Sequence, residues 1–438
     1  MFSIVWSDTT SGAMPLIVKC RSRNSIQLIQ HEISRISCST GELRTDSHAW
    51  EQRQLGEVGL TYPGLSGKTK EDFGHGDARF VTYMNVYSNA VANPDGVEAI
   101  EKDNRQHKVR NGDVFFTGSS ETPDEVGLSS VWLGNSTDTY LNSFCFGYRP
   151  SKQLDSLFLA SSLRSPQMRS RMILLAQGIS RFNISKTQVM QLPLCFPSLP
   201  EQRSIGEFFT TLDNLIAAAE RQEALLRQKK QAYLQLMFPQ EGETEPRLRF
   251  AGFSGEWSRR QLGELITEHK ETVDSHCTLP ILTSSKTEGI TLQEEHFGHK
   301  QSHDIAGYNV VPRGYCTYRN RSDDMDFTFN VNNYCDKGII SKFYPVFRGN
   351  GNDTLFISLV LNHCEEVLRE IGYTCTGTGQ RVLAFSDLQM MRIPIPTHAE
   401  QQKVAKFFEI FDSLIVATEQ RTESLRALKS AYLQRMFV

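Results

Sequence analysis

The sequence predicts an α+β protein with an internal pseudo-twofold repeat, in which two β-rich domains are separated by a pair of long antiparallel helices. The first observation is that Glu201–Phe238 realigns without a gap on Glu400–Phe437, with about half of the positions identical. The offset, 400 − 201 = 199 residues, is far longer than the repeat of a solenoid. The second observation is that WEQRQLGE at Trp50–Glu57 matches WSRRQLGE at Trp257–Glu264. The chain is therefore two copies of one module, each beginning at a tryptophan and closing with a helix.

Length and composition favour a multidomain protein without a membrane anchor. The chain has 438 residues, of which 39% are hydrophobic and 22% charged, as in ordinary globular proteins. No apolar run approaches the roughly 18 residues that cross a bilayer, and the first residues do not resemble a signal peptide. We therefore expect a cytoplasmic protein. Its nine cysteines are dispersed without a CxxC pair, which predicts reduced thiols and no metal site.

The formal net charge of −3 neither supports nor excludes a nucleic-acid partner. Basic residues nevertheless gather in both globular stretches. These clusters are Arg164, Arg169, Arg171 and Arg181 in the first, and Arg313, Arg319 and Arg321 in the second.

The repeat divides the chain into six segments. We expect an N-terminal extension of poor order at 1–41, a first globular domain at 42–198, a first helix at 199–239, a linker at 240–256, a second globular domain at 257–397 and a second helix at 398–438.

Both helices carry apolar residues at alternating spacings of four and three, the pattern of a seam for a partner helix. The predicted seam residues are Phe208, Leu212, Leu215, Leu226, Tyr233, Phe407, Phe411, Leu414, Leu425 and Tyr432. A helix of about 37 residues is roughly 55 Å long, so it cannot bury its seam within one small domain. The two helices therefore pair most simply with each other. The alternative is two independent helices, each packed on its own domain.

Prolines mark where the helices begin and end. Pro197 and Pro200 precede the first helix, and Pro394 and Pro396 precede the second; proline removes a backbone donor and disfavours helix in the residue before it. Pro239 ends the first helix.

The globular stretches consist mainly of short strands and turns. Strands are predicted at 80–83, 113–117, 130–133 and 143–148, and a helix at 154–175 carries the arginine cluster of the first stretch. The second stretch repeats this plan with strands within 310–318 and 338–347 and a helix at 354–371.

Motifs for catalysis or cofactor binding are weak. The segment Tyr62–Thr69 approaches a phosphate-binding loop, but that motif requires glycine at the position of Tyr62. His75 with Asp72 and Asp77 suits a surface turn better than a metal site. The stretch Cys375–Arg381 lacks the third glycine of a dinucleotide-binding fingerprint, and offers backbone N–H groups and hydroxyls to a phosphate backbone instead. We expect no catalytic activity in this chain.

The doubled motif resembles the specificity subunit of type I restriction–modification systems. The matching residues are a Pro-x-x-x-Glu-Gln segment before each long helix, a Tyr-Leu-x-x-Met-Phe ending on each helix, and RLRFAGF at Arg247–Phe253 before Trp257. The segments 112–123 and 141–144 also resemble one class of target-recognition domain. The resemblance covers 42–438, whereas residues 1 to about 40 match nothing in the repeat.

This resemblance implies a function in DNA recognition. Two target-recognition domains would each read one half of a bipartite asymmetric site in double-stranded DNA, and the paired helices would set the gap. The same helices would dock two modification (methyltransferase) subunits, which use S-adenosylmethionine to methylate adenine. Separate restriction subunits would use ATP and Mg for translocation and cleavage, so this chain would need no cofactor.

Base reading requires Arg, Lys, Asn, Gln or hydroxyl side chains on loops that enter a groove. The candidates are Lys68, Lys70, Ser119, Ser120 and Arg181 in the first domain, and Arg319, Asn320, Arg321, Gln380 and Arg381 in the second. The alternative from another functional class is a non-catalytic scaffold, with two peptide-binding domains on a helical spacer.

Overall fold

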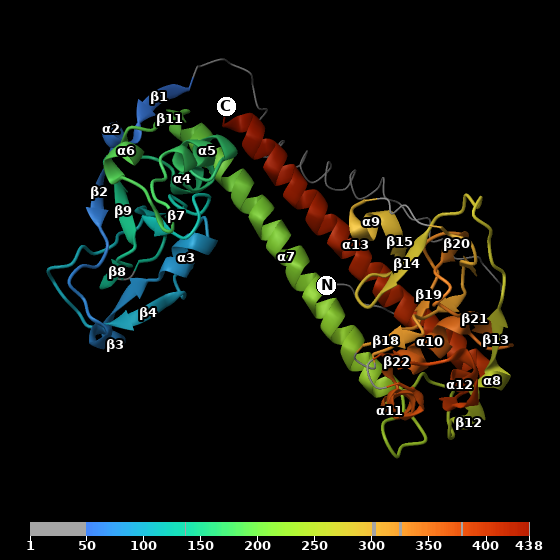
Figure 1. Ribbon diagram of the computed structural model, residues 1–438. Coiled ribbons are helices and arrows are strands. Elements are labelled where there is room, and N and C mark those ends of the chain that lie inside the picture. Colours follow the sequence, from blue (N-terminus) through green and yellow to red (C-terminus); the bar gives the residue numbers. More distant parts are fainter. Residues whose placement is uncertain (1–49, 136, 300–303, 324–325, 378–379, 438) are drawn as a thin grey trace. The chain divides into compact units, whose positions relative to one another are not determined.

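The computed structural model describes residues 50–135, 137–299, 304–323, 326–377 and 380–437 (Figure 1). The chain divides into two compact units, one comprising the residues through Ala219 and those from Gln420 on, the other Glu220–Glu419. Each unit contains one globular domain and a part of both long helices, α7 (Leu199–Met237) and α13 (His398–Met436). The predicted extension 1–41 and the predicted domain start at 42 lie outside the described residues.

The first unit is built on a four-stranded antiparallel sheet with the order β2-β9-β5-β7. These strands are β2 (Gly59–Pro63), β5 (Val114–Thr117), β7 (Ser129–Val131) and β9 (Cys145–Pro150). Every residue of β5 is buried, in keeping with the apolar run Val-Phe-Phe in the centre of the sheet. A second sheet consists of β3 (Phe73–Val81), β4 (Val97–Ile100) and β8 (Thr139–Leu141). Its central strand, β3, is antiparallel to β4 and parallel to β8.

Short helices and two-strand pairs complete this domain. The helices are α2 (Leu55–Val58), the 3₁₀ turn η1 (Lys70–Asp72), α3 (Tyr83–Ser88), α4 (Ser156–Ser162), α5 (Pro166–Leu174) and α6 (Lys186–Met190). The strand pairs are β1 (Glu51–Gln54) with β11 (Pro193–Phe196), and β6 (Ser119–Ser120) with β10 (Phe182–Asn183).

The single helix predicted at 154–175 is wrong, because α4 and α5 are separate. Ser165 has extended backbone angles and its side chain accepts a hydrogen bond from the Met168 N–H, which begins a new helix. Pro166 occupies the first helical turn, where a missing N–H costs nothing.

The second unit repeats this plan. Its four-stranded sheet has the order β13-β21-β17-β19, the counterpart of the first unit's central sheet. The strands are β13 (Ile266–His269), β17 (Cys316–Thr317), β19 (Asn330–Val331) and β21 (Val346–Gly349). Further pairs are β12 (Ser258–Gln261) with β23 (Arg392–Ile395), β14 (Leu282–Ser285) with β15 (Gly289–Leu292), β16 (Asn309–Pro312) with β20 (Lys337–Ile340), and β18 (Arg321–Ser322) with β22 (Arg381–Val382).

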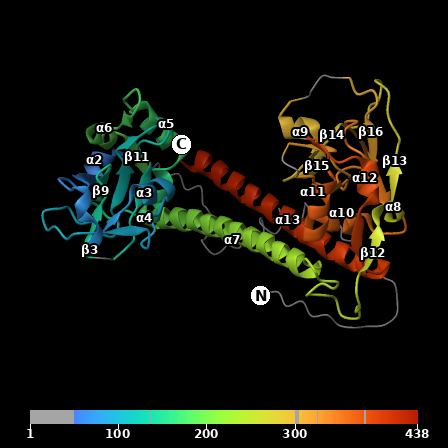
Figure 2. The same ribbon diagram turned by 60° about the horizontal axis from the view of Figure 1, so that its bottom comes forward.

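The helices of the second domain also follow the first. They are α8 (Leu262–Leu265), α9 (Gln293–Phe297), α10 (Thr354–His363), α11 (Glu365–Thr374) and α12 (Phe385–Met390). As with α4 and α5, the predicted helix at 354–371 is divided, and α10 and α11 lie next to each other (Figure 2).

The repeated Glu-Gln motif fixes the start of each long helix to its domain. Buried Gln202 donates to the Pro197 carbonyl at 2.9 Å and accepts from the Asp155 N–H at 3.1 Å. Asp155 in turn caps α4. In the second unit Gln401 makes the same two bonds, at 3.0 Å each, with Pro396 and Asp353. The motif is therefore structural: one amide satisfies a carbonyl and an N–H that would otherwise be buried without partners.

The repeated Met-Phe ending of one helix completes the core around the start of the other. In the first unit, the ring of Phe437 lies 5.9 Å from Phe209, 5.8 Å from Phe158 and 6.2 Å from Trp50, measured between centroids. Phe437 follows α13, whereas Phe209 lies in α7, so both repeats contribute to this core.

The second unit has the equivalent cluster. Phe238, which follows α7, lies 6.0 Å from Trp257, 5.9 Å from Phe356 and 6.1 Å from Phe408. Aromatic clusters of this kind bury large apolar areas, and their rings prefer edge-to-face or offset-stacked packing. Each core therefore requires residues from both copies of the module.

The helices are antiparallel within each unit, as predicted. In the first unit Phe208 packs on Tyr432 and Lys429 pairs with Asp213, so residue numbers rise along α7 as they fall along α13. In the second unit Tyr233 packs on Phe407 and Lys230 pairs with Asp412.

The contact stripe differs from the predicted seam at one of its ten positions. Leu414 was predicted to lie in the seam but is 46% exposed, whereas Ile415 is only 5% exposed. The other nine predicted seam residues are buried or half-buried: Phe208, Leu212, Leu215, Leu226, Tyr233, Phe407, Phe411, Leu425 and Tyr432. Of the two neighbouring lysines, Lys229 is exposed and Lys230 pairs with Asp412.

Candidate nucleic-acid interface

Both domains have a two-stranded sheet directly after a strand of the central sheet. In the first domain β6 follows β5 after a single residue and pairs with β10. In the second domain β18 follows β17 after three residues and pairs with β22. This sheet contains or adjoins most of the residues predicted to read DNA.

Backbone hydrogen bonds show that the two sheets are structurally equivalent. The Gly118 N–H donates to the Phe144 carbonyl at 2.8 Å, and the Asn320 N–H donates to the Phe343 carbonyl at 2.9 Å. Gly118 therefore corresponds to Asn320, and Phe144 to Phe343. The next residues, Ser119 and Arg321, correspond as well.

The loop that precedes the second strand of each sheet is also shared. Gln177 and Asn183 exchange two backbone hydrogen bonds of 2.9 Å, as do Thr376 and Val382. The offsets, 376 − 177 and 382 − 183, are both 199 residues, the period of the sequence repeat. By this offset Arg181 corresponds to Gln380.

A glycine is required at the start of each loop. Gly178 and Gly377 have positive φ angles of 149° and 97°. A Cβ at these positions would lie 2.0 Å from the Arg181 carbonyl oxygen and 2.4 Å from that of Gln380. The backbone conformation therefore accounts for the glycine at position 377, and no nucleotide-binding function is needed to explain it.

Arg181 is the exposed cation of the first sheet. Its Nε donates to the Ser119 hydroxyl at 3.0 Å, and its guanidinium carbon lies 5.2 Å from the centre of the Phe144 ring. The Tyr83 hydroxyl donates to the Ser119 carbonyl at 3.0 Å, which holds the strand in place. The structure thus brings together Ser119 and Arg181, two of the predicted residues.

Ser120 has another role. It is buried, and its hydroxyl donates to the Glu125 carboxylate at 2.7 Å. Hydrogen bonds from Ser120 and then from Tyr87 hold the pKa of Glu125 below its usual value. The prediction that Ser120 reads DNA is not favoured by this arrangement, because its hydroxyl already has a charged partner.

All five predicted residues of the second domain lie at its two-stranded sheet or next to it. Arg321 and Ser322 of β18 pair with Val382 and Arg381 of β22. Arg319 and Asn320 immediately precede β18, and Gln380 precedes β22.

The second sheet is rich in cationic and amide groups. The guanidinium carbon of Arg321 lies 4.6 Å from the centre of the Phe343 ring, and the Lys342 ammonium lies 5.7 Å from the same centre. Gln380 donates to Asp323 at 3.2 Å. The side-chain oxygen of Asn320 is buried and has no hydrogen-bond partner within the described residues.

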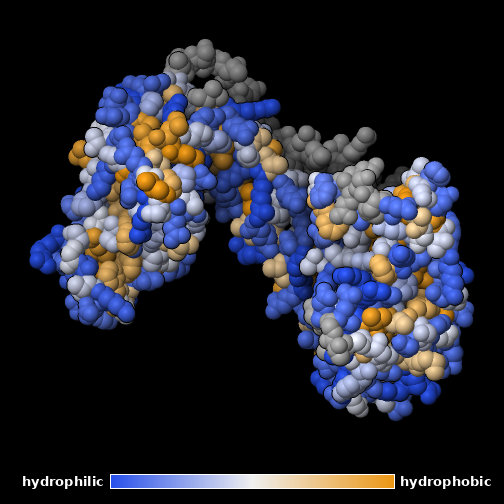
Figure 3. All heavy atoms as spheres, viewed as in Figure 1, coloured by the Kyte–Doolittle hydropathy of each residue, from blue (hydrophilic) through white to orange (hydrophobic). Residues whose placement is uncertain are grey.

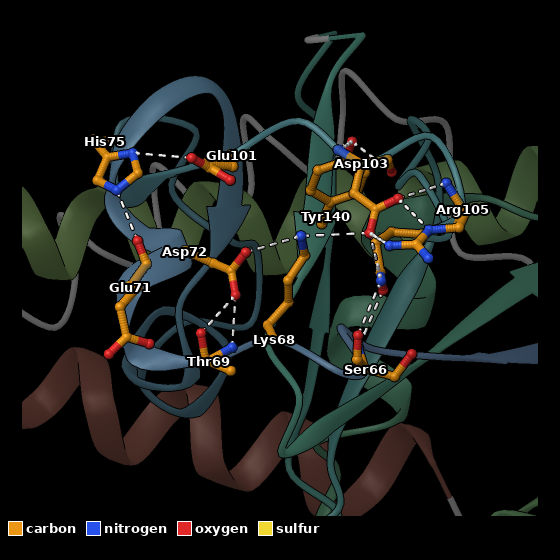
Figure 4. Close-up of polar contacts among 11 residues, drawn as sticks. Ser66, Lys68, Thr69, Glu71, Asp72, His75, Glu101, Asp103, Arg105 and Tyr140 are labelled. Atoms are coloured by element: carbon orange, nitrogen blue, oxygen red, sulfur yellow. Dashed lines mark hydrogen bonds and ion pairs between the residues drawn. The ribbon is translucent and has the colours of Figure 1, made fainter.

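Lys68 lies in a separate polar cluster of the first domain (Figure 4), and Lys70 begins η1 two residues later. The Lys68 ammonium lies between the Asp72 and Asp103 carboxylates, 3.4 Å from each, and its side chain is only 10% exposed. Arg105 and Lys68 together hold the pKa of Asp103 far below its usual range, with Arg105 the larger cause. Lys68 is therefore an internal ion-pairing residue, whereas Lys70 is exposed.

Three arginines of the first-domain cluster bind backbone carbonyls of their own domain. Arg164 donates to the backbone carbonyls of Ser129, Val86, Tyr87 and Asn89, and burial lowers its pKa to about 10. Arg169 donates to two further carbonyls and Arg171 to one. Arginine content alone therefore overstated the basic surface of this domain.

The structure also decides against a nucleotide loop at Tyr62–Thr69. Tyr62 lies in β2 and donates to buried Asp113 at 2.6 Å. Thr69 caps η1, a turn of three residues that is too short to bind phosphate at its N-terminus. Within the described residues, no group of His, Cys, Asp or Glu is placed to hold a metal ion.

Comparison with known proteins identifies the family to which this repeated architecture belongs. The model of the type I restriction modification DNA specificity domain matches residues 48–228 and 256–427, which together make up most of the chain. The chain belongs to the family of type I restriction–modification specificity subunits. A Methanocaldococcus jannaschii protein named for the specificity subunit of the type I restriction enzyme MjaX is 22% identical over 409 residues, covering 89% of this chain and 92% of that protein.

A solved structure has the same fold. The S subunit of a type I restriction–modification system from M. genitalium matches with a TM-score of 0.55 and 12% identity, over 90% of this chain and 98% of that one. The HsdS subunit from Thermoanaerobacter tengcongensis matches with a TM-score of 0.46 and 18% identity, over 92% and 99% of the two chains. None of the described helices is long and apolar enough to span a bilayer.

Two residues at the equivalent sheets were not predicted. Phe144 and Phe343 are 51% and 38% exposed, and each lies beneath a cation. The available signal was a phenylalanine in a polar turn just before a strand, Asn-Ser-Phe in one domain and Ser-Lys-Phe in the other.

Proposed function

We propose that this specificity subunit reads a bipartite, asymmetric sequence in double-stranded DNA, one half with each domain. The observation that carries the proposal is the pair of equivalent two-stranded sheets, each of which presents an exposed arginine. Arg181 and Arg321 have no carboxylate partner within the described residues, unlike Arg105 or Arg313, which are ion-paired. Arginine without a carboxylate partner suits the edges of bases and the phosphate backbone.

The side chains that differ between the two sheets support different half-sites. Where the first domain has Ser119 the second has Arg321, and where the first has Arg181 the second has Gln380. Donor and acceptor patterns in the major groove are read by such side chains, so two domains with different patterns prefer different bases. Arg319, Asn320 and Arg381 add donors in the second domain, and Lys70 is exposed for a phosphate contact in the first.

The paired helices would set the gap between the half-sites and dock two modification subunits. Support comes from exposed apolar side chains on these helices within the second unit: Leu225, Ile410, Leu414 and Val416 are each 46–49% exposed. Figure 3 shows apolar side chains interrupting the hydrophilic surface along the helices. Exposed apolar groups of this kind mark surfaces that bind other proteins.

In this function the chain contributes recognition and its partners contribute the chemistry. Modification subunits would bind S-adenosylmethionine and methylate adenine, and restriction subunits would use ATP and Mg, all in the cytoplasm. The alternative function, a scaffold with two peptide-binding domains, predicts no preference for any DNA sequence.

The proposal is tested by selecting duplexes from a random library with the complex of this chain and a modification subunit from the same genome. We expect enrichment of two short motifs separated by a fixed gap. Binding to that motif should weaken steeply with salt, because phosphate contacts release counterions. Insertion or deletion of one base pair in the gap should abolish the preference.

Enrichment of a single uninterrupted motif would contradict the bipartite mechanism. Absence of any enriched sequence, with binding that does not depend on salt, would favour the scaffold.

A further inference from the structure

Each domain places one guanidinium over one exposed phenylalanine at an equivalent point of its fold. Phe144 immediately precedes β9, and Phe343 lies three residues before β21, the corresponding strand. Both carbonyls accept the hydrogen bond that defines this equivalence, from Gly118 and Asn320. The backbones beneath both rings are therefore anchored in the same way.

The two arginines reach these rings from different strands. Arg181 comes from the loop before β10, whereas Arg321 lies on β18. The position that corresponds to Arg321 in the first domain is Ser119, and the position that corresponds to Arg181 in the second domain is Gln380. The shared element is therefore the ring, since the residue that supplies the cation has changed.

Both rings present part of their surface to solvent, with Phe144 51% and Phe343 38% exposed. Stacking of a guanidinium on the ring face covers the ring and is attractive, because the π-face is negative. It also restricts the rotamers of a long side chain while leaving the N–H donors in the guanidinium plane available. The result is an arginine that is oriented before any ligand arrives.

We propose that Phe144 and Phe343 are positioning residues that hold Arg181 and Arg321 for bidentate recognition of a guanine, one in each half-site. The inference rests on the proposed function and assigns its specificity. Arginine pairs with the O6 and N7 of guanine through two parallel N–H groups. In Arg181 the Nε–H is taken by Ser119, so the two terminal nitrogens are the pair that faces the base.

The second domain adds a charge at the same ring. The Lys342 ammonium lies 5.7 Å from the centre of the Phe343 ring, to which Arg321 is also close, whereas the corresponding residue of the first domain, Ser143, is uncharged. An ammonium beside a base-reading arginine supplies a contact to phosphate, which carries no sequence preference. Lys342 should therefore contribute to affinity, and Arg321 to specificity.

The test uses the complex of the full chain with a modification subunit. The wild-type complex is first used to determine the bipartite motif, so a failure at this stage rejects the proposed function and not the positioning of the arginines. Each base pair of the motif is then varied in competition binding to Phe144→Leu, Phe144→Tyr and Arg181→Gln. The second domain is tested with Phe343→Leu and Arg321→Gln.

We expect Arg181→Gln to remove the preference for one G·C pair in one half-site, with roughly ten-fold weaker binding to the wild-type motif. Phe144→Leu should relax the same pair and weaken binding roughly three-fold, and Phe144→Tyr should restore the preference because it keeps the ring. Phe343→Leu should relax one pair in the other half-site only. In the Arg181→Gln background Phe144→Leu should have no further effect on specificity.

Two matched controls separate positioning from general damage. Phe297→Leu changes a phenylalanine that is 46% exposed and carries no arginine from the described residues. Arg105→Lys changes an exposed arginine of the polar cluster around Lys68. Both should leave the motif unchanged.

Three results would overturn the inference while leaving the proposed function intact. The first is that Phe144→Leu weakens binding to all sequences alike. The second is that it leaves binding unchanged although Arg181→Gln relaxes one position. The third is that the positions relaxed by Arg181→Gln and Arg321→Gln are not G·C pairs.

Discussion

The ring of Phe437 stacks on that of Phe209 with their centroids 5.9 Å apart and an interplanar angle of 28°. The two residues are 228 positions apart, from 437 − 209, and belong to different copies of the module. Phe437 is 7% exposed, although it lies at the C-terminal end of the chain. The first domain therefore depends on the end of the second repeat.

Replacement of Phe437 by alanine should destabilise the first domain by about 3 kcal/mol, the cost of truncating a buried phenylalanine. Hydrogen exchange followed by mass spectrometry should show loss of protection in β5 and α4, with protection in the second domain retained. Phe238→Ala should have the mirrored effect on the second domain, and Ile410→Ala, at an exposed position of α13, should change little. Equal loss of protection in both domains after Phe437→Ala would contradict this account of the cores.

The substitution Asp113→Asn should destabilise the first domain by about 3 kcal/mol, because it removes the charge of a buried carboxylate and leaves Arg149 without its carboxylate partner. Asp113 is 1% exposed and accepts from the Arg149 guanidinium and the Tyr62 hydroxyl, each at 2.6 Å. Urea unfolding measures the difference. The control is Asp336→Asn, which removes an exposed partner of Arg313 and should cost less than about 1 kcal/mol. Similar losses in the free energy of unfolding for the two variants would show that burial does not determine how much each ion pair stabilises the fold.

The second unit should lose stability as the pH falls from about 6.5 to about 4. Burial lowers the pKa of His363 to about 4, and the neighbouring Lys230 lowers it further while Asp412 opposes the shift. The folded state therefore binds fewer protons than the unfolded state in this window, so stability is complete above the unfolded pKa and declines on acidification. The contribution is about 3 kcal/mol.

Unfolding of the wild type and of His363→Gln across this pH range measures that contribution. The difference in stability between the two proteins should change between pH 7 and pH 4. Parallel stability curves would exclude His363 as the titrating group.

Replacement of Lys68 by alanine should lower the unfolding temperature of the first domain without changing the DNA motif. The reason is that Lys68 neutralises Asp72 and Asp103 inside the domain. The methylation motif and the melting temperature are measured together, with Lys70→Ala as the control, since Lys70 is exposed and close in sequence. A changed motif after Lys68→Ala would show that Lys68 does read DNA. ATP binding by the wild-type chain that Lys68→Ala abolishes would instead support a nucleotide-binding loop at Tyr62–Thr69.

Much of the architecture could be predicted because the repeat itself is informative. The shared Glu-Gln and Met-Phe segments predicted both long helices and their termini. The structure shows why these segments recur: Gln202 and Phe437 make tertiary contacts, and the equivalent residues Gln401 and Phe238 make the same contacts in the other unit. The contact stripe was harder, because Leu414 and Ile415 are both apolar. The spacing pattern alone does not show which of these two neighbours is buried.

The site could be predicted in part. The five residues named in the second domain form two groups that are distant in the sequence, 319–321 and 380–381, and the pairing of β18 with β22 brings them together. Lys68 and Ser120 were polar residues in turns. Ser120 pairs with Glu125 five residues away, whereas Lys68 pairs both with nearby Asp72 and with distant Asp103. The pairing with Asp103 leaves no local signal, and the same holds for the arginine that Phe144 supports.

The account is tested most directly by a single-molecule map of methylated adenines across a host genome, with and without the gene for this chain. We predict that one gapped, two-part motif is methylated when the chain is present and is unmethylated when its gene is deleted. An unchanged methylation pattern after deletion would contradict the conclusion that the two domains direct modification to a bipartite site.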